Sequence, residues 1–354
     1  MSGPAPSPAR AGEGPLLEVE GIARTYAAPG GAFRRRGEAI HAVRDVTFQL
    51  RRGETLALVG ESGCGKSTTA RIVLGLERPD AGTVRFDGAD VHGLSGADLL
   101  SFRRRAQIVF QDPVGSLNPR IRVGEALGEP LRVHGVVPRE RVAARVAGLL
   151  RRVGLDPEDA DRYPHEFSGG QRQRIGIARA LSVEPDLVVA DEPVSALDVS
   201  VQAQVLNLLS DLQRDLGLTY LFIAHDLAVV RHVARRVAVM YMGRIVESGT
   251  CEALFERPLH PYTRALLEAV PRPRPGRRVR APVRGEARAG AVPEAGCPFE
   301  PRCTHPERDA ACRATLPPLE HKRPEGWARC IKTPAWRVVE EMGPPAGVAD
   351  EPPA

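Results

Sequence analysis

The sequence predicts an α/β fold whose core is a mostly parallel β-sheet. The first observation is an apolar run, 55–59, that suits a buried strand and is followed by a glycine-rich turn and a stretch suited to a helix. The second is that two more apolar runs, 187–190 and 220–224, alternate with helical patterns. Strands that alternate with helices favour parallel pairing, and ligands then gather at the carboxyl ends of the strands.

An N-terminal antiparallel β subdomain is expected ahead of this core. Alternating apolar residues predict a first strand that ends near Tyr26, and a Gly/Arg-rich loop, 27–39, follows it. Asp87-Gly88 suits the turn of a hairpin. The strands expected in this region are 16–26, 43–50 and 83–86.

A helical insert is expected within residues 95–182, where the alternation of strands and helices is interrupted. Ser95-x-x-Asp98 is a candidate capping box at its first helix, and a strand at 106–110 follows. Two more helices come next, and apolar residues recur on one face of the second until Gly154 ends the pattern. These apolar residues are Val142, Val146, Leu149, Leu150 and Val153.

The alternation resumes after the insert. A helix is expected at 172–181, followed by the strand 187–190, a long helix and the strand 220–224. The long helix is predicted from an apolar face with helical spacing. That face consists of Val201, Val205, Leu208, Leu209, Leu212 and Leu216.

Composition limits the classes of function. The chain has 354 residues, of which 42% are hydrophobic, and no window approaches 18 consecutive apolar residues, so no membrane span is expected. Residues 1–15 lack an apolar core, which predicts a disordered tail in a cytoplasmic protein and not a signal peptide. The net charge of +5 is spread over short arginine clusters. Solvated faces or acidic lipid headgroups explain these clusters as well as nucleic acid does, and no nucleic-acid partner is expected.

The composition of the chain changes after the main domain, 16–270. Residues 271–293 are rich in Arg, Pro, Gly and Ala without a sustained period, which predicts a linker. Residues 294–335 are expected to form a small extension with four cysteines, and residues 336–354 a loose tail.

The glycine-rich turn is the centre of the predicted chemistry. Residues 60–67 fit G-x-x-x-x-G-K-[ST], in which backbone N–H groups at a helix start surround a polyphosphate. Lys66 would reach the β- and γ-phosphates of a nucleotide, and the Ser67 hydroxyl would ligate Mg²⁺. An ordinary glycine-rich turn is the alternative, and the flanking strand and helix argue against it. The residues expected to contact the nucleotide are Gly60, Glu61, Ser62, Gly63, Cys64, Gly65, Lys66, Ser67 and Thr68.

Two more motifs favour a nucleotide-hydrolysing site. Asp191 and Glu192 follow an apolar strand, so Asp191 is expected beside the Mg²⁺ ion and Glu192 is expected to position and deprotonate the attacking water. Surface acids after a strand are the alternative. Ser168, Gly169, Gly170 and Gln171 form a compact anion nest at a helix N-terminus, which also suits a phosphate. Two phosphate-binding motifs in one chain make sense if the second serves a nucleotide held by another molecule.

These motifs, in this order, resemble the ATP-binding cassette of ABC transporters, which is a P-loop NTPase fold. The resemblance implies that Tyr26 stacks on adenine, that Gln111 senses Mg²⁺ and the attacking water, and that His225 contacts the γ-phosphate. It implies that 168–171 is the signature that closes on a partner's γ-phosphate, and that Asp198 belongs to the D-loop. The implied catalytic residues are Glu192, His225 and Gln111, and the implied Mg²⁺ ligands are Ser67, Gln111 and Asp191.

Four longer motifs resemble the peptide-importer branch of that family, most closely the second ATPase subunit of dipeptide and oligopeptide importers. They are 110–113, 116–119, 163–167 and 260–267. The resemblance implies a peripheral ATPase at the cytoplasmic face of the membrane that powers peptide import. The implied partners are two permease subunits, a second and related ATPase subunit, and indirectly an extracytoplasmic solute-binding protein.

Three other functions stay open. One is the same role in an importer of nickel or another small solute. Another is a soluble ABC ATPase acting on ribosomes or in DNA repair, although this chain has neither two cassettes nor a long coiled-coil insert. The third is a non-catalytic subunit, against which Glu192 and His225 argue.

The final extension holds Cys297, Cys303, Cys312 and Cys330. Their spacing lacks the short pairs of most zinc sites, but four thiols in a core-poor segment suggest a metal that stabilises it. The resemblance implies a [4Fe–4S] cluster, and zinc or free thiols stay open. Cys251 is expected to be a small buried residue.

Overall fold

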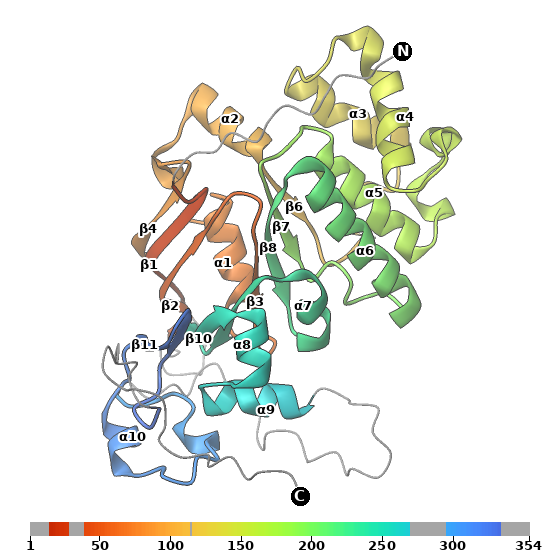
Figure 1. Cartoon of the computed structure of the whole chain (residues 1–354). Helices are drawn as coiled ribbons and strands as arrows, with labels where there is room; N and C mark the ends of the chain where they lie inside the picture. Colours follow the sequence, from red (N-terminus) through yellow and green to blue (C-terminus); the bar gives the residue numbers. More distant parts are fainter. Residues whose placement is uncertain (1–13, 28–38, 114, 270–294, 334–354) are drawn as a thin grey trace, which may run out of the picture.

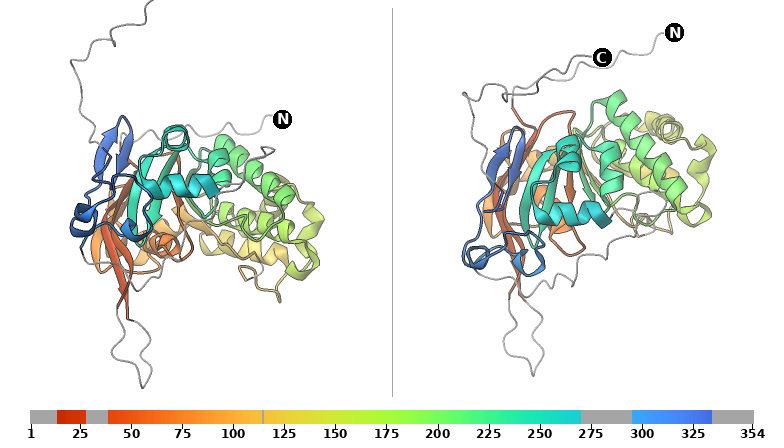
Figure 2. Two further views of the ribbon diagram at one scale, coloured as in Figure 1. Left: turned by 90° about the horizontal axis from the view of Figure 1, so that it is seen from below. Right: turned by 60° about the horizontal axis from the view of Figure 1, so that its bottom comes forward.

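The computed structural model describes residues 14–27, 39–113, 115–269 and 295–333. The helical insert lies at one end of the molecule and the C-terminal segment near the opposite end, in every view (Figure 1 and Figure 2). Four predicted segments lie wholly or almost wholly outside the described residues: the tails 1–15 and 336–354, the loop 27–39, and the linker 271–293.

The larger sheet has eight strands in the order β11-β12-β10-β9-β3-β8-β7-β6. The strands from β9 to β6 pair in parallel, and those at the other edge pair antiparallel, which confirms the mixed, mostly parallel core. The strands are β3 (Thr55–Val59), β6 (Ala106–Val109), β7 (Leu187–Asp191), β8 (Thr219–Ala224), β9 (Arg236–Tyr241), β10 (Arg244–Thr250), β11 (Glu320–Arg323) and β12 (Gly326–Ala328).

The smaller sheet is antiparallel and has the order β2-β1-β4-β5. Asp87 and Gly88 have φ values of +53° and +82°, so the predicted hairpin turn forms with both residues in the left-handed region. The strand predicted at 43–50 begins three residues earlier, at Ile40. The strands are β1 (Leu17–Tyr26), β2 (Ile40–Leu50), β4 (Ala81–Phe86) and β5 (Ala89–Asp90).

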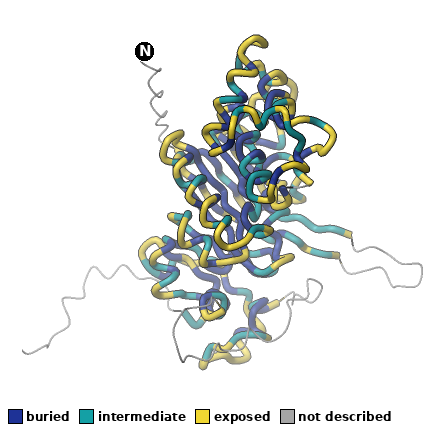
Figure 3. Tube along the Cα trace, turned by 90° about the vertical axis from the view of Figure 1, so that its right-hand side faces the viewer, coloured by how far each residue is buried: buried dark blue, intermediate teal, exposed yellow. Residues whose placement is uncertain are grey.

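Both faces of the parallel core are covered. Along β3, Ala57 and Val59 face an apolar cluster shared with the helices, while Leu56 and Leu58 face a second cluster shared with the antiparallel sheet. The strands therefore read as continuous apolar runs. Figure 3 shows these buried strands between more exposed helices and loops. The helices are α1 (Lys66–Val73), α2 (Gly96–Arg105), α3 (Val123–Val133), α4 (Val142–Arg152), α5 (Gly169–Leu181), α6 (Val199–Leu216), α7 (Leu227–Val233), α8 (Cys251–Glu256), α9 (Pro261–Ala269) and α10 (Ala310–Ala314).

The apolar face that the sequence predicts on α4 packs against α3 and α5, within the larger apolar cluster. Every residue of that face on α4 and just after it is buried, and Gly154 ends the helix with a φ of +74°. The predicted capping box at Ser95 is wrong. Ser95 is the N-cap of α2, but its side chain makes no capping hydrogen bond, and its carbonyl oxygen accepts the N–H of Leu99 instead.

Two other helix predictions need correction. Helix α5 begins at Gly169, three residues before the predicted start, because Ser168 caps it reciprocally with Gln171. On α6, Leu216 was predicted on the apolar face but is 40% exposed. It is the last residue of the helix, and Gly217 turns the chain away with a φ of +65°.

The C-terminal segment joins the larger sheet through β12, which pairs with β10. Arg329, just after β12, donates a hydrogen bond of 2.8 Å to Asp45 on β2 and so also ties the segment to the smaller sheet. The division of the chain into domains stays a prediction. None of the described helices has both the length and the apolar character needed to cross a bilayer.

Candidate active site

The loop Gly60–Ser67 joins the end of β3 to the start of α1. At Gly65, where φ is +108°, a Cβ would lie 2.1 Å from the Ala42 carbonyl oxygen. At Gly60 a Cβ would lie 2.2 Å from the Met240 carbonyl oxygen. Neither position can take a side chain unless neighbouring backbone moves, so the path of the loop depends on glycine at both places.

Lys66 lies inside this loop with its side chain 4% exposed. Its Nζ donates hydrogen bonds to the carbonyl oxygens of Gly60 at 2.8 Å and of Glu61 at 3.1 Å. The compact ammonium group is thus surrounded by backbone. Ser62 and Gly63 form the exposed tip of the loop, whereas the Cys64 thiol is buried and its pKa is raised by that burial.

Ser67 and Asp191 come together from separate elements. The Ser67 hydroxyl, on the first turn of α1, donates a hydrogen bond of 3.2 Å to Oδ1 of Asp191 at the end of β7. Burial raises the pKa of the Asp191 carboxyl, and the hydrogen bond from Ser67 opposes this shift. A half-buried carboxylate beside a hydroxyl is an oxygen pair of the kind that Mg²⁺ prefers.

Glu192 is the residue on which the site converges. Gln111, after β6, donates a hydrogen bond of 3.2 Å to Oε2 of Glu192. Nδ1 of His225, after β8, lies 2.9 Å from the same oxygen, and Nζ of Lys66 lies 3.9 Å from Oε1. Glu192 adopts a φ of +46°, a conformation uncommon for residues other than glycine. The structure therefore brings together side chains that the sequence placed after three separate strands.

The signature residues lie apart from this cluster. Ser168 and Gly169 are exposed at the N-terminus of α5. A Cβ on Gly170 would lie 2.4 Å from the Val201 side chain, so this helix start packs against α6. Within the described residues, no hydrogen bond or ion pair joins 168–171 to the loop 60–67.

Tyr26 and Asp198 are placed by the structure without a test of their implied roles. The Tyr26 hydroxyl donates a hydrogen bond of 2.8 Å to Glu77, and the guanidinium of Arg24 lies 5.2 Å from its ring centroid. Asp198 is exposed and is the N-cap of α6. Contact of Tyr26 with adenine and of Asp198 with a nucleotide stays a prediction.

Tyr262 and Arg302 contact the loop, and neither was assigned a role from the sequence. The Glu61 N–H donates a hydrogen bond of 3.0 Å to the Tyr262 hydroxyl of α9. Arg302 of the C-terminal segment donates two hydrogen bonds, of 2.9 and 2.8 Å, to the Glu61 carboxylate. Tyr262 lies in the motif 260–267, which the sequence analysis had singled out. No sequence motif marked Arg302, because its partner Glu61 lies 241 positions away.

The four cysteines of the C-terminal segment line one cavity. The remaining lining includes the apolar side chains of Phe299, Pro317 and Ile331. Burial raises the pKa of Cys297 to about 11. Among the described residues, no group of three or more His, Cys, Asp or Glu side chains has the arrangement that a single metal ion needs. The cysteines concerned are Cys297, Cys303, Cys312 and Cys330.

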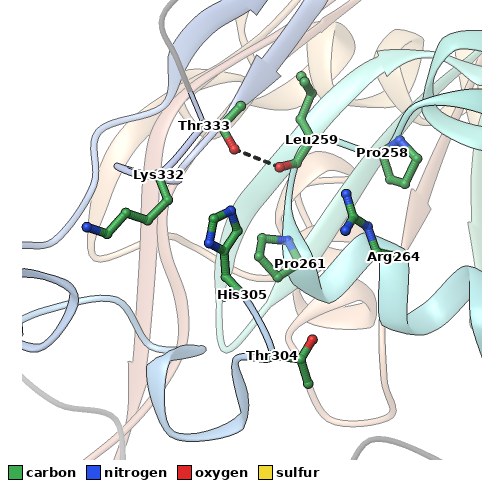
Figure 4. A pocket seen from close by; sticks show the side chains of 8 residues that line it. All are labelled: Pro258, Leu259, Pro261, Arg264, Thr304, His305, Lys332 and Thr333. Carbon is green, nitrogen blue, oxygen red and sulfur yellow. Dashed lines mark hydrogen bonds between the residues drawn. The ribbon is translucent and has the colours of Figure 1, made fainter. Parts of the chain in front are cut away.

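A second cavity lies where the C-terminal segment meets α9 (Figure 4). Thr333 closes one side of it by donating a hydrogen bond of 2.8 Å to the Leu259 carbonyl oxygen. His305, Lys332 and Arg264 are the basic residues that line the same cavity. The Lys332 ammonium is already paired with Asp309 at 2.6 Å.

Two family models match the chain. The model described as ABC transporter matches residues 43–195, which contain the loop, the signature and the acids after β7. The model described as oligopeptide/dipeptide transporter, C-terminal region, matches residues 246–312, which contain Tyr262 and Arg302.

Curated relatives and solved structures agree with these models. A probable peptide ABC transporter ATP-binding protein of Sinorhizobium fredii is 49% identical over 94% of this chain and 93% of its own length. A putative peptide import ATP-binding protein of Brucella ovis is 51% identical over 90% and 98%. A dimeric ATP-binding cassette solved in a post-hydrolysis state with ADP and Pi is 29% identical, with a TM-score of 0.59, over 67% of this chain and 99% of that one. The chain is therefore an ATP-binding protein of the ABC transporter family, in the group that carries the oligopeptide/dipeptide transporter C-terminal region.

Proposed function

We propose that this chain is the ATP-hydrolysing subunit of an importer of dipeptides or oligopeptides. The observation that carries the proposal is the convergence of Gln111, His225 and Lys66 on the Glu192 carboxylate beside the phosphate loop. Support for a peptide substrate comes from the C-terminal family model and from the relatives whose names refer to peptide import.

The loop is suited to hold the triphosphate of ATP. The N–H groups at the start of α1 and its positive dipole end favour an anion there. Lys66 Nζ is held by two backbone carbonyl oxygens, which it exchanges for β- and γ-phosphate oxygens when ATP binds. Ser67, Asp191 and Gln111 are the proposed holders of Mg²⁺, and the Ser67–Asp191 contact fits that role. When bound, Mg²⁺ offsets negative charge on the β- and γ-phosphate oxygens.

Glu192 is the proposed general base. Gln111 and His225 both contact its Oε2, while Oε1 lies on the side of Lys66. We assign to Oε1 the proton released by the attacking water. We also propose that His225 contacts the γ-phosphate, and its place after β8, which pairs with the strand that leads into the loop, supports this.

The signature at the start of α5 is proposed to serve the ATP of a partner subunit. Ser168 and Gly169 are exposed, and among the described residues no hydrogen bond or ion pair connects them to the loop 60–67 of their own chain. The dimeric cassette among the structural relatives supports pairing of two such chains. We propose a related ATPase chain as the partner, with Tyr26 on adenine and Asp198 at the shared interface.

We propose that the chain lies at the cytoplasmic face of the membrane and docks on two permease subunits. The docking surface would be the part of the insert near 111–119, where Phe110 is 41% exposed beside Gln111. A solute-binding protein on the far side would act only through the permease. No contact with nucleic acid is part of this proposal.

We also propose that Cys297, Cys303, Cys312 and Cys330 hold a [4Fe–4S] cluster. Four thiols line one cavity with an apolar lining, and the His305 N–H contacts the Cys303 sulfur at 3.5 Å. A single zinc ion needs its sulfurs within about 2.3 Å of one point, whereas a cluster spreads four thiolates over four irons. Zinc and free thiols are the alternatives that the metal content of the purified chain distinguishes.

Gly65→Ala is expected to weaken ATP binding far more than Gly63→Ala. The first change forces a Cβ to within 2.1 Å of the Ala42 carbonyl oxygen, while a Cβ on Gly63 meets nothing within 4 Å and adds only the strain of a positive φ. The check is the dissociation constant for ATP of each variant by equilibrium titration. Equal losses in the two variants would contradict the close-approach argument.

Glu192→Gln is expected to stop turnover while ATP still binds, because an amide cannot take the proton from water. Phosphate release should fall about 100-fold or more, with ATP affinity within about twofold of the parent chain. Glu268→Gln, at an exposed position on α9, is the matched control and should hydrolyse ATP normally. Near-normal phosphate release by Glu192→Gln would remove Glu192 from its assigned role.

The transport role predicts what accompanies the chain in the cell. Affinity-tagged chain solubilised from membranes should bring down two permease subunits and a second ATPase, identified by mass spectrometry. Cells in which the only copy carries Lys66→Ala should lose uptake of labelled dipeptide. Recovery of ribosomes or DNA instead of membrane proteins, or loss of nickel uptake with normal peptide uptake, would favour the rival functions.

Chain purified without oxygen is expected to carry four irons and four sulfides, with the visible absorption of a cluster. Cys312→Ser should lose the iron, and Cys251→Ser should keep it, because Cys251 is buried but does not line the cavity. A colourless protein with stoichiometric zinc, or metal-free chain with intact thiols, would show that no cluster is held.

A further inference from the structure

The phosphate loop is held from outside by the C-terminal segment. Arg302 lies on this segment directly before Cys303, and its side chain is 11% exposed. Its guanidinium donates hydrogen bonds of 2.9 and 2.8 Å to the two carboxylate oxygens of Glu61, the second residue of the loop. Two parallel charge-assisted hydrogen bonds fix both the position and the plane of a carboxylate.

The guanidinium of Arg302 is itself held in place by aromatic residues. Arg302 donates a hydrogen bond of 3.4 Å to the Tyr241 hydroxyl at the end of β9, and it lies 5.7 Å from the Tyr241 ring and 6.0 Å from the Phe299 ring. Tyr241, Tyr262 and Phe299 pack together with ring centroids 4.6 to 5.4 Å apart. All three rings are buried, so Arg302 has little freedom to leave Glu61.

Glu61 passes this restraint into the loop. Its carboxylate is held by Arg302 and its N–H by the Tyr262 hydroxyl, while its carbonyl oxygen accepts hydrogen bonds from Lys66 at 3.1 Å and from the Cys64 N–H at 3.3 Å. A single residue, Glu61, thus joins Arg302 and Tyr262 outside the loop to the lysine at its centre. Displacement of Glu61 would move the carbonyl oxygen that positions Lys66.

Charge gives a second reason for the pair. Glu61 places a carboxylate next to a site for a polyphosphate, and two anions at short range repel each other. Arg302 is the cation that neutralises this carboxylate. Without Arg302 the loop would be looser and would present an unpaired negative charge beside the incoming phosphates.

We propose that Arg302 is a positioning residue for ATP binding: it fixes and neutralises Glu61, and so makes the nucleotide affinity of the loop depend on the cysteine-bearing segment. The inference rests on the proposed binding of ATP by Gly60–Ser67. The C-terminal segment would then take part in the nucleotide site, although Arg302 follows Glu61 by more than 200 residues in the sequence.

The test measures the dissociation constant for ATP of the full-length chain, by equilibrium titration in EDTA so that no hydrolysis occurs. Arg302→Ala is expected to bind ATP about tenfold more weakly than the parent chain. The ATP affinity of Arg302→Lys should lie between the two, since lysine keeps the charge but cannot make two parallel hydrogen bonds to the carboxylate. Arg313→Ala is the control, because Arg313 pairs with Glu300 on the same segment and does not touch the loop. It should stay within about twofold of the parent chain.

A double variant shows whether the loss of affinity in Arg302→Ala comes from the unpaired Glu61 carboxylate or from a general loss of structure. Adding Glu61→Gln to Arg302→Ala removes the unpaired carboxylate, so ATP affinity should return to within about threefold of the parent chain. The proposal is overturned if Arg302→Ala binds ATP as Arg313→Ala does, or if the double variant binds as weakly as Arg302→Ala alone. Should Arg302→Ala not fold, parent-like affinity of Arg302→Lys would overturn it equally.

Lys66→Ala keeps the two proposals apart. If that variant binds ATP like the parent chain, the loop is not the nucleotide site and the proposed function fails. If it loses ATP while Arg302→Ala does not, the nucleotide site stands and only the role of Arg302 is refuted.

Discussion

The in-register parallel pairing of β3, β8, β7 and β6 is the constraint on which the candidate site depends. It brings the ends of four strands to one edge, so the residues that follow them meet although they are far apart in sequence. The register is strongly specified, because a slip of one residue would exchange the side chains that face the two apolar clusters. Its terminal pairs are Val59 with Ala224, Asp191 with Ile223, and Val109 with Ala190.

The charged side chains at this edge all have partners within the chain. Lys66 is satisfied by carbonyl oxygens of its own loop, Asp191 by the Ser67 hydroxyl, and Glu192 by the side chains of Gln111 and His225. The side-chain partners, Ser67, Gln111 and His225, are themselves residues proposed to contact ATP, Mg²⁺ or the attacking water. The side chains of the proposed site are therefore held in place by contacts within the chain itself.

The C-terminal segment is integrated into the ATPase core at three separate places. Its strand β12 extends the larger sheet, Arg329 reaches Asp45 on the smaller sheet, and Arg302 reaches Glu61 in the phosphate loop. A segment that the composition marks only by its cysteines thus contacts both sheets and the nucleotide site. Its cysteine cavity shares Phe299 with the aromatic group that carries Arg302.

The sequence alone determined the features that depend on neighbouring residues. Glycine spacing in 60–67, the apolar runs of β3, β7 and β8, and the one-sided face of α4 are local patterns, and the structure forms all of them. Only the tertiary structure decided which distant residues meet. The Ser95 cap depends on a side-chain orientation, the pairing of β12 with β10 joins segments about 80 residues apart, and Arg302 finds Glu61 across 241 positions. Such contacts leave no periodic trace in the sequence, because they arise from packing and charge after the chain has folded.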